Sequence, residues 1–461
     1  MSPPWTASPP APCAARTGRR LPVRVAGGRL RAARSEGITL DLDLLSLSRR
    51  LDRRLAPFAA PGTPGCAVGI MRGGELVLHR QAGLASLELG VPIGPETCFR
   101  IASVTKQFTC AAILLLAAEG RLSPDDEVRA HIPELPDFGV PITLDHLMRN
   151  CSGLRDMLEL SRLGGLDLAQ PCTPAQLLAA ICRQRTLNFA PGSRFLYCNS
   201  GFFLLGLVVE RVSGEALGAF LERRIFAPLG MTRTRMVAGT EEVVPGLATG
   251  YLPAPGGFVR AQHGFALGGE GGMVSCVEDL ALWARNYATG RVGGPALAGA
   301  LQDRQAFANG VLNRYARGLE AGEHRGLATM DHGGLWPGYK TCFMRVPALD
   351  LAIIAISNHG GADPHHLAHQ VLDDVAEGAP ALLPAPILPP RAALEALSGT
   401  WVEDGTGATL DLYLAEDGTP MVRGHGVPFA LAPTADGRLA ARRGVFCFTL
   451  RREGEGLEVE A

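Results

Sequence analysis

The pattern of apolar and polar positions predicts helices and a few strands up to about residue 378, and short strands after residue 390. Apolar residues recur at helical spacing over 40–60, and 99–119 is apolar on nearly every side, as in a buried helix that ends at Gly120. A continuous apolar run over 349–357 is typical of a buried strand. The pattern also predicts a hairpin around Gly73-Gly74, N-caps at Thr143 and Thr173, and helices over 199–212, 217–226, 279–288 and 364–375.

The texture of the chain changes near its C-terminal end. Residues 379–390 consist almost entirely of Pro, Ala and Leu, a composition that indicates a linker. Beyond it, short apolar runs are separated by turn signals such as Asp417-Gly418 and Asp436-Gly437. We therefore expect 391–461 to form a small antiparallel β-barrel domain, with a sandwich as the alternative.

The first 37 residues have a composition of their own. They contain seven arginines and no acidic residue before Glu36, and Pro and Ala dominate the rest. No apolar segment follows the arginines, so a secretory signal is not expected. We interpret residues 1–37 as a disordered extension, or as translated sequence upstream of the natural start.

Composition narrows the class of protein. With 47% apolar and 19% charged residues, the chain is globular, and its net charge of −1 gives no electrostatic case for nucleic acid or a membrane surface. No stretch has the ~18 apolar residues that a membrane-spanning helix needs. Eleven cysteines without zinc-site spacing favour free thiols and a cytoplasmic location. We expect a protein that acts on a small molecule, without a metal or cofactor.

Lysine usage points to the candidate chemistry. Of 44 Lys and Arg residues only two are lysines, Lys106 and Lys340. Lysine, unlike arginine, loses its proton readily when it is desolvated. Ser103 and Lys106 are spaced i and i+3 on one face of the predicted helix, with Ser103 at the positive end of the helix dipole. This pair predicts a serine nucleophile with a lysine general base; the alternative is a core helix with a lysine that snorkels to the surface.

Two further motifs carry polar groups that serve acyl transfer. In Tyr197-Cys198-Asn199, the outer two side chains point the same way if the stretch is extended, and Tyr197 then relays protons. In His332-Gly333-Gly334, the glycines permit close approach of a substrate, and the N–H groups of Leu335 and Ser103 would form an oxyanion hole. The alternatives are a tyrosine packed before a helix and an ordinary turn.

Taken in order, these motifs resemble the serine β-lactamase and penicillin-binding-protein superfamily. The match over 40–378 includes the segment 99–109 around Ser103, Tyr197-Cys198-Asn199 and His332-Gly333-Gly334, and it extends to Asn150–Asp156, Gly271–Ser275 and Trp336–Tyr339. The His-x-Gly form of the third motif is similar to the D-aminopeptidase branch. The resemblance implies an α+β, β-lactamase-like domain over 38–378, with an antiparallel sheet flanked by helices and an all-helical lobe around 120–240.

The resemblance also implies a function. It predicts release of an N-terminal D-amino acid, such as D-alanine, from small peptides, amides or esters through an acyl-enzyme on Ser103. Lys106 and Tyr197 would share the proton transfers, Asn199 would position groups, and His332 would line the opposite wall. A broad esterase or amidase and a DD-peptidase are the alternatives. Family members often form dimers, so a homodimer is possible.

Three more groups are candidate site residues. Lys340-Thr341-Cys342 resembles a broken Lys-Thr-Gly motif, but it lacks the glycine, and His332 is the preferred third element. Glu270 is either an acceptor for a substrate ammonium group or a solvated loop acid. His365, His366 and His369 have metal-compatible spacing on one helix, but a polar helix face is the preferred explanation and no metal site is proposed.

Overall fold

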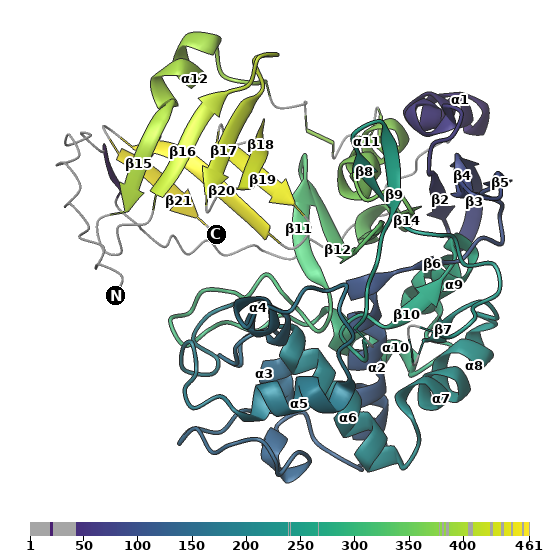
Figure 1. The fold of residues 1–461 in the computed structure, drawn as a ribbon, viewed down its shortest axis with the longest axis vertical. Coiled ribbons are helices and arrows are strands. Elements are labelled where there is room, and N and C mark those ends of the chain that lie inside the picture. The colour runs from purple at the N-terminus through teal and green to yellow at the C-terminus, as the bar shows by residue number, and fades with distance from the viewer. Residues whose placement is uncertain are drawn as a thin grey trace, which may run out of the picture. The chain divides into compact units, whose positions relative to one another are not determined.

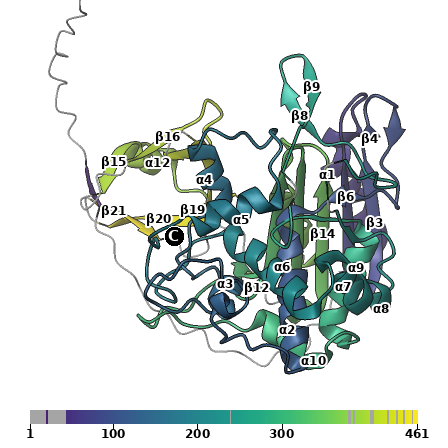
Figure 2. The same cartoon turned by 60° about the horizontal axis from the view of Figure 1, so that its bottom comes forward.

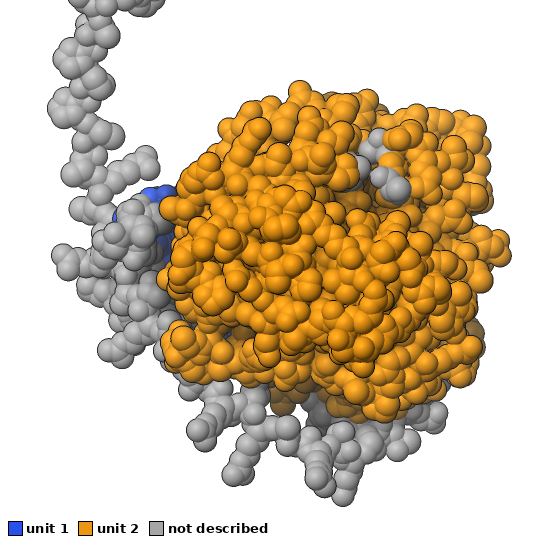
Figure 3. Space-filling model, turned by 90° about the horizontal axis from the view of Figure 1, so that it is seen from below, with its two compact units in different colours: residues 1–26, 384–461 blue, residues 27–383 orange. Residues whose placement is uncertain are grey.

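The computed structural model describes residues 19–21 and 43–460, apart from short gaps at 238, 240, 266, 378, 380–381, 384–386, 404–408, 425–426, 435–437, 444–445 and 454–455. The chain divides into two compact units, one of residues 27–383 and one of residues 1–26 with 384–461 (Figure 3). The division falls within the predicted linker 379–390. Apart from 19–21, the predicted N-terminal extension lies outside the described residues, and the domain limits stay a prediction.

A six-stranded antiparallel sheet forms the centre of the larger unit (Figure 2). Its strands, in spatial order, are β11 (Glu320–His324), β12 (Leu327–Trp336), β13 (Tyr339–Val346), β14 (Leu351–Ser357), β2 (Cys66–Arg72) and β3 (Glu75–Ala82). The turn between β2 and β3 has positive φ at both Gly73 and Gly74, the conformation that a tight hairpin favours. The predicted hairpin is confirmed. The buried strand predicted over 349–357 is confirmed from Leu351 onwards, because Leu349 ends a 3₁₀ turn, Pro347–Leu349.

Helices cover both faces of this sheet because its strands alternate their apolar side chains (Figures 1 and 2). Val68 and Ile70 of β2 face a core shared with α1 (Leu44–Leu55) and α11 (Pro364–Val375). Ala67 and Met71 of the same strand face a second core, which includes α2 (Thr105–Ala118) and α9 (Val277–Thr289). All of α2 from Thr105 to Ile113 is buried, as expected of a helix that is apolar on nearly every side.

The helical lobe follows α2 in the chain. Its helices are α3 (Leu144–Met148), α4 (Met157–Leu163), α5 (Pro174–Cys182), α6 (Asn199–Ser213), α7 (Leu217–Leu221), the π-helix Glu222–Phe226 and α8 (Ala227–Leu229). Thr143 and Thr173 both form capping boxes, which confirms the two predicted N-caps. No helix among the described residues is both long and apolar enough to cross a membrane.

Smaller elements complete this unit. They are β4 (Leu84–Ser86), β5 (Val91–Pro92), β6 (Phe99–Arg100), β7 (Arg235–Met236), β8 (Tyr251–Ala254), β9 (Gly257–Arg260), β10 (Met273–Ser275) and α10 (Gly294–Gln302). The short sheet β6-β10-β7 holds the chain where it enters the segment around Ser103. The unit has the predicted α+β architecture.

Among its described residues, the smaller unit has one helix and a long sheet. Helix α12 (Arg391–Leu397) precedes β15 (Gly399–Glu403), β16 (Thr409–Leu414), β17 (Pro420–Gly424), β18 (Val427–Pro433), β19 (Leu439–Arg443), β20 (Phe446–Glu453) and β21 (Gly456–Glu460). These seven strands pair antiparallel in chain order, and β1 (Arg19–Leu21) adds to β15 in parallel. The described strands show no ladder that joins β21 to the other end of the sheet, so an antiparallel sheet is confirmed and its closure into a barrel stays a prediction.

Candidate active site

Ser103 lies at the start of the central helix. It belongs to a 3₁₀ turn, Ala102–Val104, that continues directly into α2. Ala102, immediately before it, has a φ of +47°, a conformation that costs free energy in a residue with a Cβ. Strained backbone of this kind persists where the surrounding structure fixes it.

Lys106 lies one turn further along α2, and its amine contacts three oxygen atoms. The distance from Lys106 Nζ is 3.0 Å to Ser103 Oγ, 2.9 Å to Asn199 Oδ1 and 2.6 Å to the backbone carbonyl oxygen of Glu270. The last two oxygens can only accept hydrogen bonds, so they use both N–H groups of a neutral amine. The remaining lone pair of the amine is then directed at the Ser103 hydroxyl.

The surroundings of Lys106 favour that neutral form. Its side chain is fully buried, and burial lowers the pKa of the amine, while the nearby carboxyl of Glu270 opposes this change. A neutral amine that faces a serine hydroxyl is able to accept the hydroxyl proton. The structure therefore brings the two residues of the predicted pair together.

Tyr197 and Asn199 are held in place by the loop that follows α3. Asn150, with a φ of +53°, accepts a hydrogen bond from the N–H of Cys198 through its side chain at 3.0 Å. Asp156 accepts one from the N–H of Asn199 and also caps α4. The stretch before α6 is thereby kept extended, and Cys198 turns its thiol away, towards the carbonyl of Leu154. The side chains of Tyr197 and Asn199, on either side of Cys198, both lie beside Lys106. They point the same way, as their i and i+2 spacing predicted.

The Tyr197 phenol points into this cluster without a hydrogen-bond partner among the described residues. Lys106 Nζ lies 4.7 Å from the centre of its ring. Burial raises the pKa of the phenol well above its usual value, and the nearby Ser103 hydroxyl lowers it in part. Tyr197 is therefore a neutral phenol, able to donate a proton to a group that occupies the site.

Strand β12 forms the opposite side of the site. Its pairing with β11 ends at Asp331 opposite Glu320, so His332–Leu335 present a strand edge that no described strand covers. A Cβ on Gly334 would lie 2.2 Å from the carbonyl oxygen of Ile101, which only glycine avoids. Gly333 precedes it within the strand, and the Leu335 side chain is 61% exposed. A strand edge of this kind can hold an extended substrate through backbone hydrogen bonds.

His332 lies beside Tyr197, with the centres of the two rings 6.2 Å apart. Its side chain is fully buried, its Nε2 lies 2.8 Å from Tyr315 Oη, and its Nδ1 lies 2.6 Å from the carbonyl oxygen of Gly333. Burial lowers its pKa to about 3, so the imidazole is neutral. Both ring nitrogens are engaged inside the protein, and neither faces a substrate. His332 therefore supports the wall without forming its surface.

Two residues of the site were missed by sequence reasoning. Tyr315 binds His332, and its ring lies 6.3 Å from that of Tyr197. Gly318, with a φ of +74°, lets the same loop pass close to α2, since a Cβ there would lie 2.7 Å from the carbonyl oxygen of Lys106. A single tyrosine and a single glycine in a loop carry no periodic signal, so only the fold reveals them.

Glu270 is buried, which overturns its interpretation as a solvated loop acid. Its residue exposure is 2%, one carboxyl oxygen accepts a hydrogen bond from the Gly268 N–H at 3.0 Å, and the other has no partner among the described residues. Burial raises the pKa of this carboxyl. Glu270 belongs to the Gly-rich segment beside Lys106, and its carboxyl is not displayed to solvent.

The remaining candidates lie elsewhere. Lys340, on β13, donates to the carbonyl of Ala362 at 2.6 Å. His369 stacks on His324, whose Nε2 lies 2.7 Å from Asp373. Among the described residues, no three His, Cys, Asp or Glu side chains are arranged to hold a metal ion.

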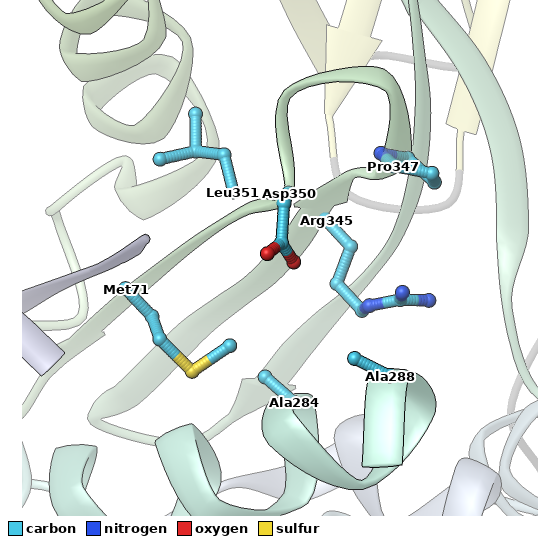
Figure 4. Close-up of a pocket in the computed structure, with 7 residues that line it drawn as sticks. All are labelled: Met71, Ala284, Ala288, Arg345, Pro347, Asp350 and Leu351. Atoms are coloured by element: carbon cyan, nitrogen blue, oxygen red, sulfur yellow. The ribbon is translucent and has the colours of Figure 1, made fainter. Parts of the chain in front are cut away.

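A cavity of about 260 Å³ contains none of the site residues. It is lined by Met71, Ala284, Ala288, Arg345, Pro347, Asp350 and Leu351 (Figure 4). The guanidinium group of Arg345 is already engaged, because it lies over the Tyr287 ring at 4.0 Å and donates to Gln302 at 2.8 Å. We assign this cavity no role in the chemistry.

Comparison with known proteins identifies the family. The Beta-lactamase family model matches residues 51–377. A D-aminopeptidase from Brucella anthropi is 32% identical over 399 residues, which cover 86% of this chain and 74% of that protein. The D-amino acid amidase from Ochrobactrum anthropi SV3, solved with L-phenylalanine amide, is 25% identical with a TM-score of 0.61 and covers 72% of this chain and 98% of its own.

A more distant structure agrees in fold. The octameric penicillin-binding protein homologue from Pyrococcus abyssi has a TM-score of 0.65 at 23% identity and covers 91% of this chain and 98% of its own. Together with the family match and the D-aminopeptidase relative, it confirms the resemblance that the ordered motifs predicted. The chain belongs to the Beta-lactamase family and is a serine hydrolase of that family.

Proposed function

We propose that this serine hydrolase releases an N-terminal D-amino acid, such as D-alanine, from small peptides, amides or esters through an acyl-enzyme on Ser103. The observation that carries the proposal is the position of Lys106 Nζ, which lies 3.0 Å from Ser103 Oγ and within hydrogen-bond distance of two carbonyl oxygens. When the amine is neutral, these two acceptors leave its lone pair for the Ser103 hydroxyl. This arrangement supplies a nucleophile and its base without a charged partner.

Acylation follows from these positions. Ser103 Oγ attacks the substrate carbonyl carbon while its proton passes to Lys106 Nζ, and the carbonyl oxygen becomes an oxyanion. The N–H groups of Ser103 and Leu335 would stabilise that oxyanion. Collapse of the intermediate breaks the bond to the leaving amine or alcohol, which takes a proton from Tyr197 or Lys106. The two groups share the proton that Ser103 gave up.

Deacylation reverses the roles. Water attacks the acyl carbon and gives a proton to the Lys106 and Tyr197 pair, and Ser103 leaves with a proton returned to its oxygen. Asn199 holds the lysine amine throughout by accepting one of its N–H bonds. The products are the free amino acid and the regenerated serine.

Two observations support a preference for substrates with an N-terminal amino acid: the similarity to known relatives, and the lack of charge on His332. The D-aminopeptidase and D-amino acid amidase resemblances favour amino-acid amides and peptides. A DD-peptidase needs a cation for the free carboxylate of its substrate, and the neutral His332 does not supply one. A broad esterase or amidase stays the second candidate, because the exposed strand edge at Leu335 suits varied acyl groups.

The test compares four chromogenic substrates. We would measure hydrolysis of the D-alanine and L-alanine p-nitroanilides, a p-nitrophenyl ester and a chromogenic cephalosporin, with Ser103→Ala as the inactive control. Cleavage of the D-amide that is lost in the variant supports the proposal. Ester hydrolysis with neither amide cleaved favours the esterase, and activity that survives Ser103→Ala overturns the mechanism.

We also propose a cytoplasmic location and, as the oligomeric state, a homodimer. The described cysteines are free thiols, as a reducing compartment favours. Cell fractionation and light scattering test the two statements directly.

A further inference from the structure

The Gly-rich segment before β10 is fastened to α2 by three side chains of one helix face. Thr109 donates to the carbonyl of Gly269 at 2.7 Å, Lys106 donates to that of Glu270 at 2.6 Å, and Thr105 accepts from the N–H of Met273 at 3.2 Å. A Cβ on Gly269 would lie 2.7 Å from the carbonyl oxygen of Phe202, so the segment also lies tightly against α6. Its position relative to Lys106 is therefore fixed.

Glu270 is the acidic residue of this segment, and its carboxyl is only half satisfied. One oxygen accepts the Gly268 N–H, while the other is buried without a partner among the described residues. The carboxyl is held inside the protein, where the residue is only 2% exposed, and is not displayed on the surface. A buried carboxyl in this state is costly unless it holds a proton or interacts with a nearby cation.

The available cation is Lys106, whose protonated form is attracted by the Glu270 carboxylate. The other titratable groups that act on the pair are acids or neutral groups: Asp156, Tyr197, Cys198, Cys110 and His332. Asp156 is committed to the N–H groups of Leu158, Glu159 and Asn199. Of the acids named here, Glu270 is therefore the one whose protonation state can change together with that of Lys106.

We propose that Glu270 is a positioning residue that sets the proton occupancy of Lys106, with its backbone carbonyl orienting the amine at 2.6 Å and the charge of its buried carboxyl favouring the protonated amine. The inference rests on the proposed function, in which Lys106 is the base. When the carboxyl is neutral, the amine loses its proton more readily and can accept that of Ser103. When the carboxyl is charged, it favours the protonated amine, which cannot accept the serine proton. The protonation of each group therefore depends on that of the other.

The two lysines of the chain make a direct test possible. Labelling with ¹³Cε-lysine gives signals from Lys106 and Lys340 alone, and Lys340→Arg assigns them. In Glu270→Gln the negative charge is gone, so Lys106 should lose its proton at a pH about one unit lower than in the unmodified protein. Glu278→Gln is the matched control, because Glu278 pairs with His79 outside the site and should leave both signals unchanged.

The pH midpoint of the Lys106 signal tests the inference without any substrate. A Lys106 midpoint that stays in place, or moves to higher pH, in Glu270→Gln overturns the inference even if the variant loses activity, because a purely structural residue would give that result. If Glu270→Gln does not fold, Glu270→Ala also removes the charge and must shift the midpoint in the same direction. Failure of the proposed function is seen separately, as the absence of Ser103-dependent hydrolysis in the unmodified protein.

Discussion

At the residue scale, the two lysines of the chain have different surroundings: Lys106 lies inside the site and Lys340 lies outside it. Lys106→Arg keeps the positive charge but removes the group that can release a proton, since the guanidinium stays protonated in proteins. We expect hydrolysis to fall by at least about 10³-fold, in the range lost when a general base is removed. Lys340→Arg should retain nearly full activity, because Lys340 binds the carbonyl of Ala362.

Lys106 also determines how kcat/KM should depend on pH. Burial lowers the pKa of Lys106, and only the neutral amine accepts a proton, so kcat/KM should rise with pH through the midpoint of the lysine. His332, with its pKa of about 3, is neutral over this pH range, so its titration causes no rise or fall in the pH profile of kcat/KM. The profile of His332→Gln should therefore keep the same midpoint at a lower rate. A midpoint that disappears in this variant would contradict the assignment of the base.

Individual site residues could be predicted where chemistry and spacing act together. Ser103 and Lys106 were readable because i and i+3 share a helix face, and Tyr197 and Asn199 because they flank one residue of an extended stretch. The hydrogen bonds that hold His332 inside the protein could not be predicted from the sequence. Its partner Tyr315 lies 17 residues away in sequence, and the burial that neutralises the imidazole arises only from tertiary packing.

At the scale of elements, the approach of β12 to the segment before Ser103 depends on one missing side chain. Gly334→Ala would place a Cβ 2.2 Å from the carbonyl oxygen of Ile101, and neither backbone can move without displacing the strand edge. We expect a loss of activity of 100-fold or more, from displacement of the reacting groups by about 1 Å, with a destabilisation of about 1–3 kcal/mol. Steady-state kinetics and urea unfolding measure the two effects.

A glycine with open surroundings gives the control for that substitution. Gly299 lies in α10, and a Cβ there meets no atom within 4 Å. Gly299→Ala should leave activity unchanged and stabilise the helix by about 0.5–1 kcal/mol. Equal activity losses in the two variants would show that the strand edge has no special part in the site.

Elements with strong periodic signals were predicted closely, and short ones were not. The helix Pro364–Val375 agrees with the pattern residue for residue. Helix α12 and strand β21 were missed, because seven and five residues give too little periodicity to stand out from a linker or a chain end. The order of strands in the central sheet depends on long-range pairing that the pattern does not contain.

At the scale of the whole molecule, a buried ionic network joins the helical lobe to the loops around the site. Arg149 binds Asp145 at 2.7 Å and Asp303 at 2.7 Å, and Arg317 binds Asp145 at 2.6 Å. Arg149→Met leaves Asp145 with a single partner in a buried position, which should lower the free energy of unfolding by about 3–5 kcal/mol. Arg162→Met, which breaks the exposed pair with Glu159, should change it by less than about 1 kcal/mol.

The stability of the larger unit should fall on mild acidification, because it buries histidines in the neutral form. Burial lowers the pKa of His332 to about 3 and that of His263 to about 4. Below about pH 6.5 the unfolded chain binds protons at these positions and the folded one does not, so each costs up to about 1.4 kcal/mol per pH unit. The raised pKa of Glu270 acts in the opposite direction over the same range.

The contribution of His332 can be isolated by comparing two pH values within each variant. Between pH 7 and pH 5, the free energy of unfolding of the unmodified protein should fall by about 1–2 kcal/mol more than that of His332→Gln, because the variant has no imidazole to protonate in the unfolded state. His366→Gln, at an exposed position on α11, should fall as far as the unmodified protein. Urea unfolding at the two pH values gives both differences. Parallel falls in all three proteins would mean that His332 takes up its proton in the folded state as readily as in the unfolded one, which would remove the basis for a neutral imidazole behind the site.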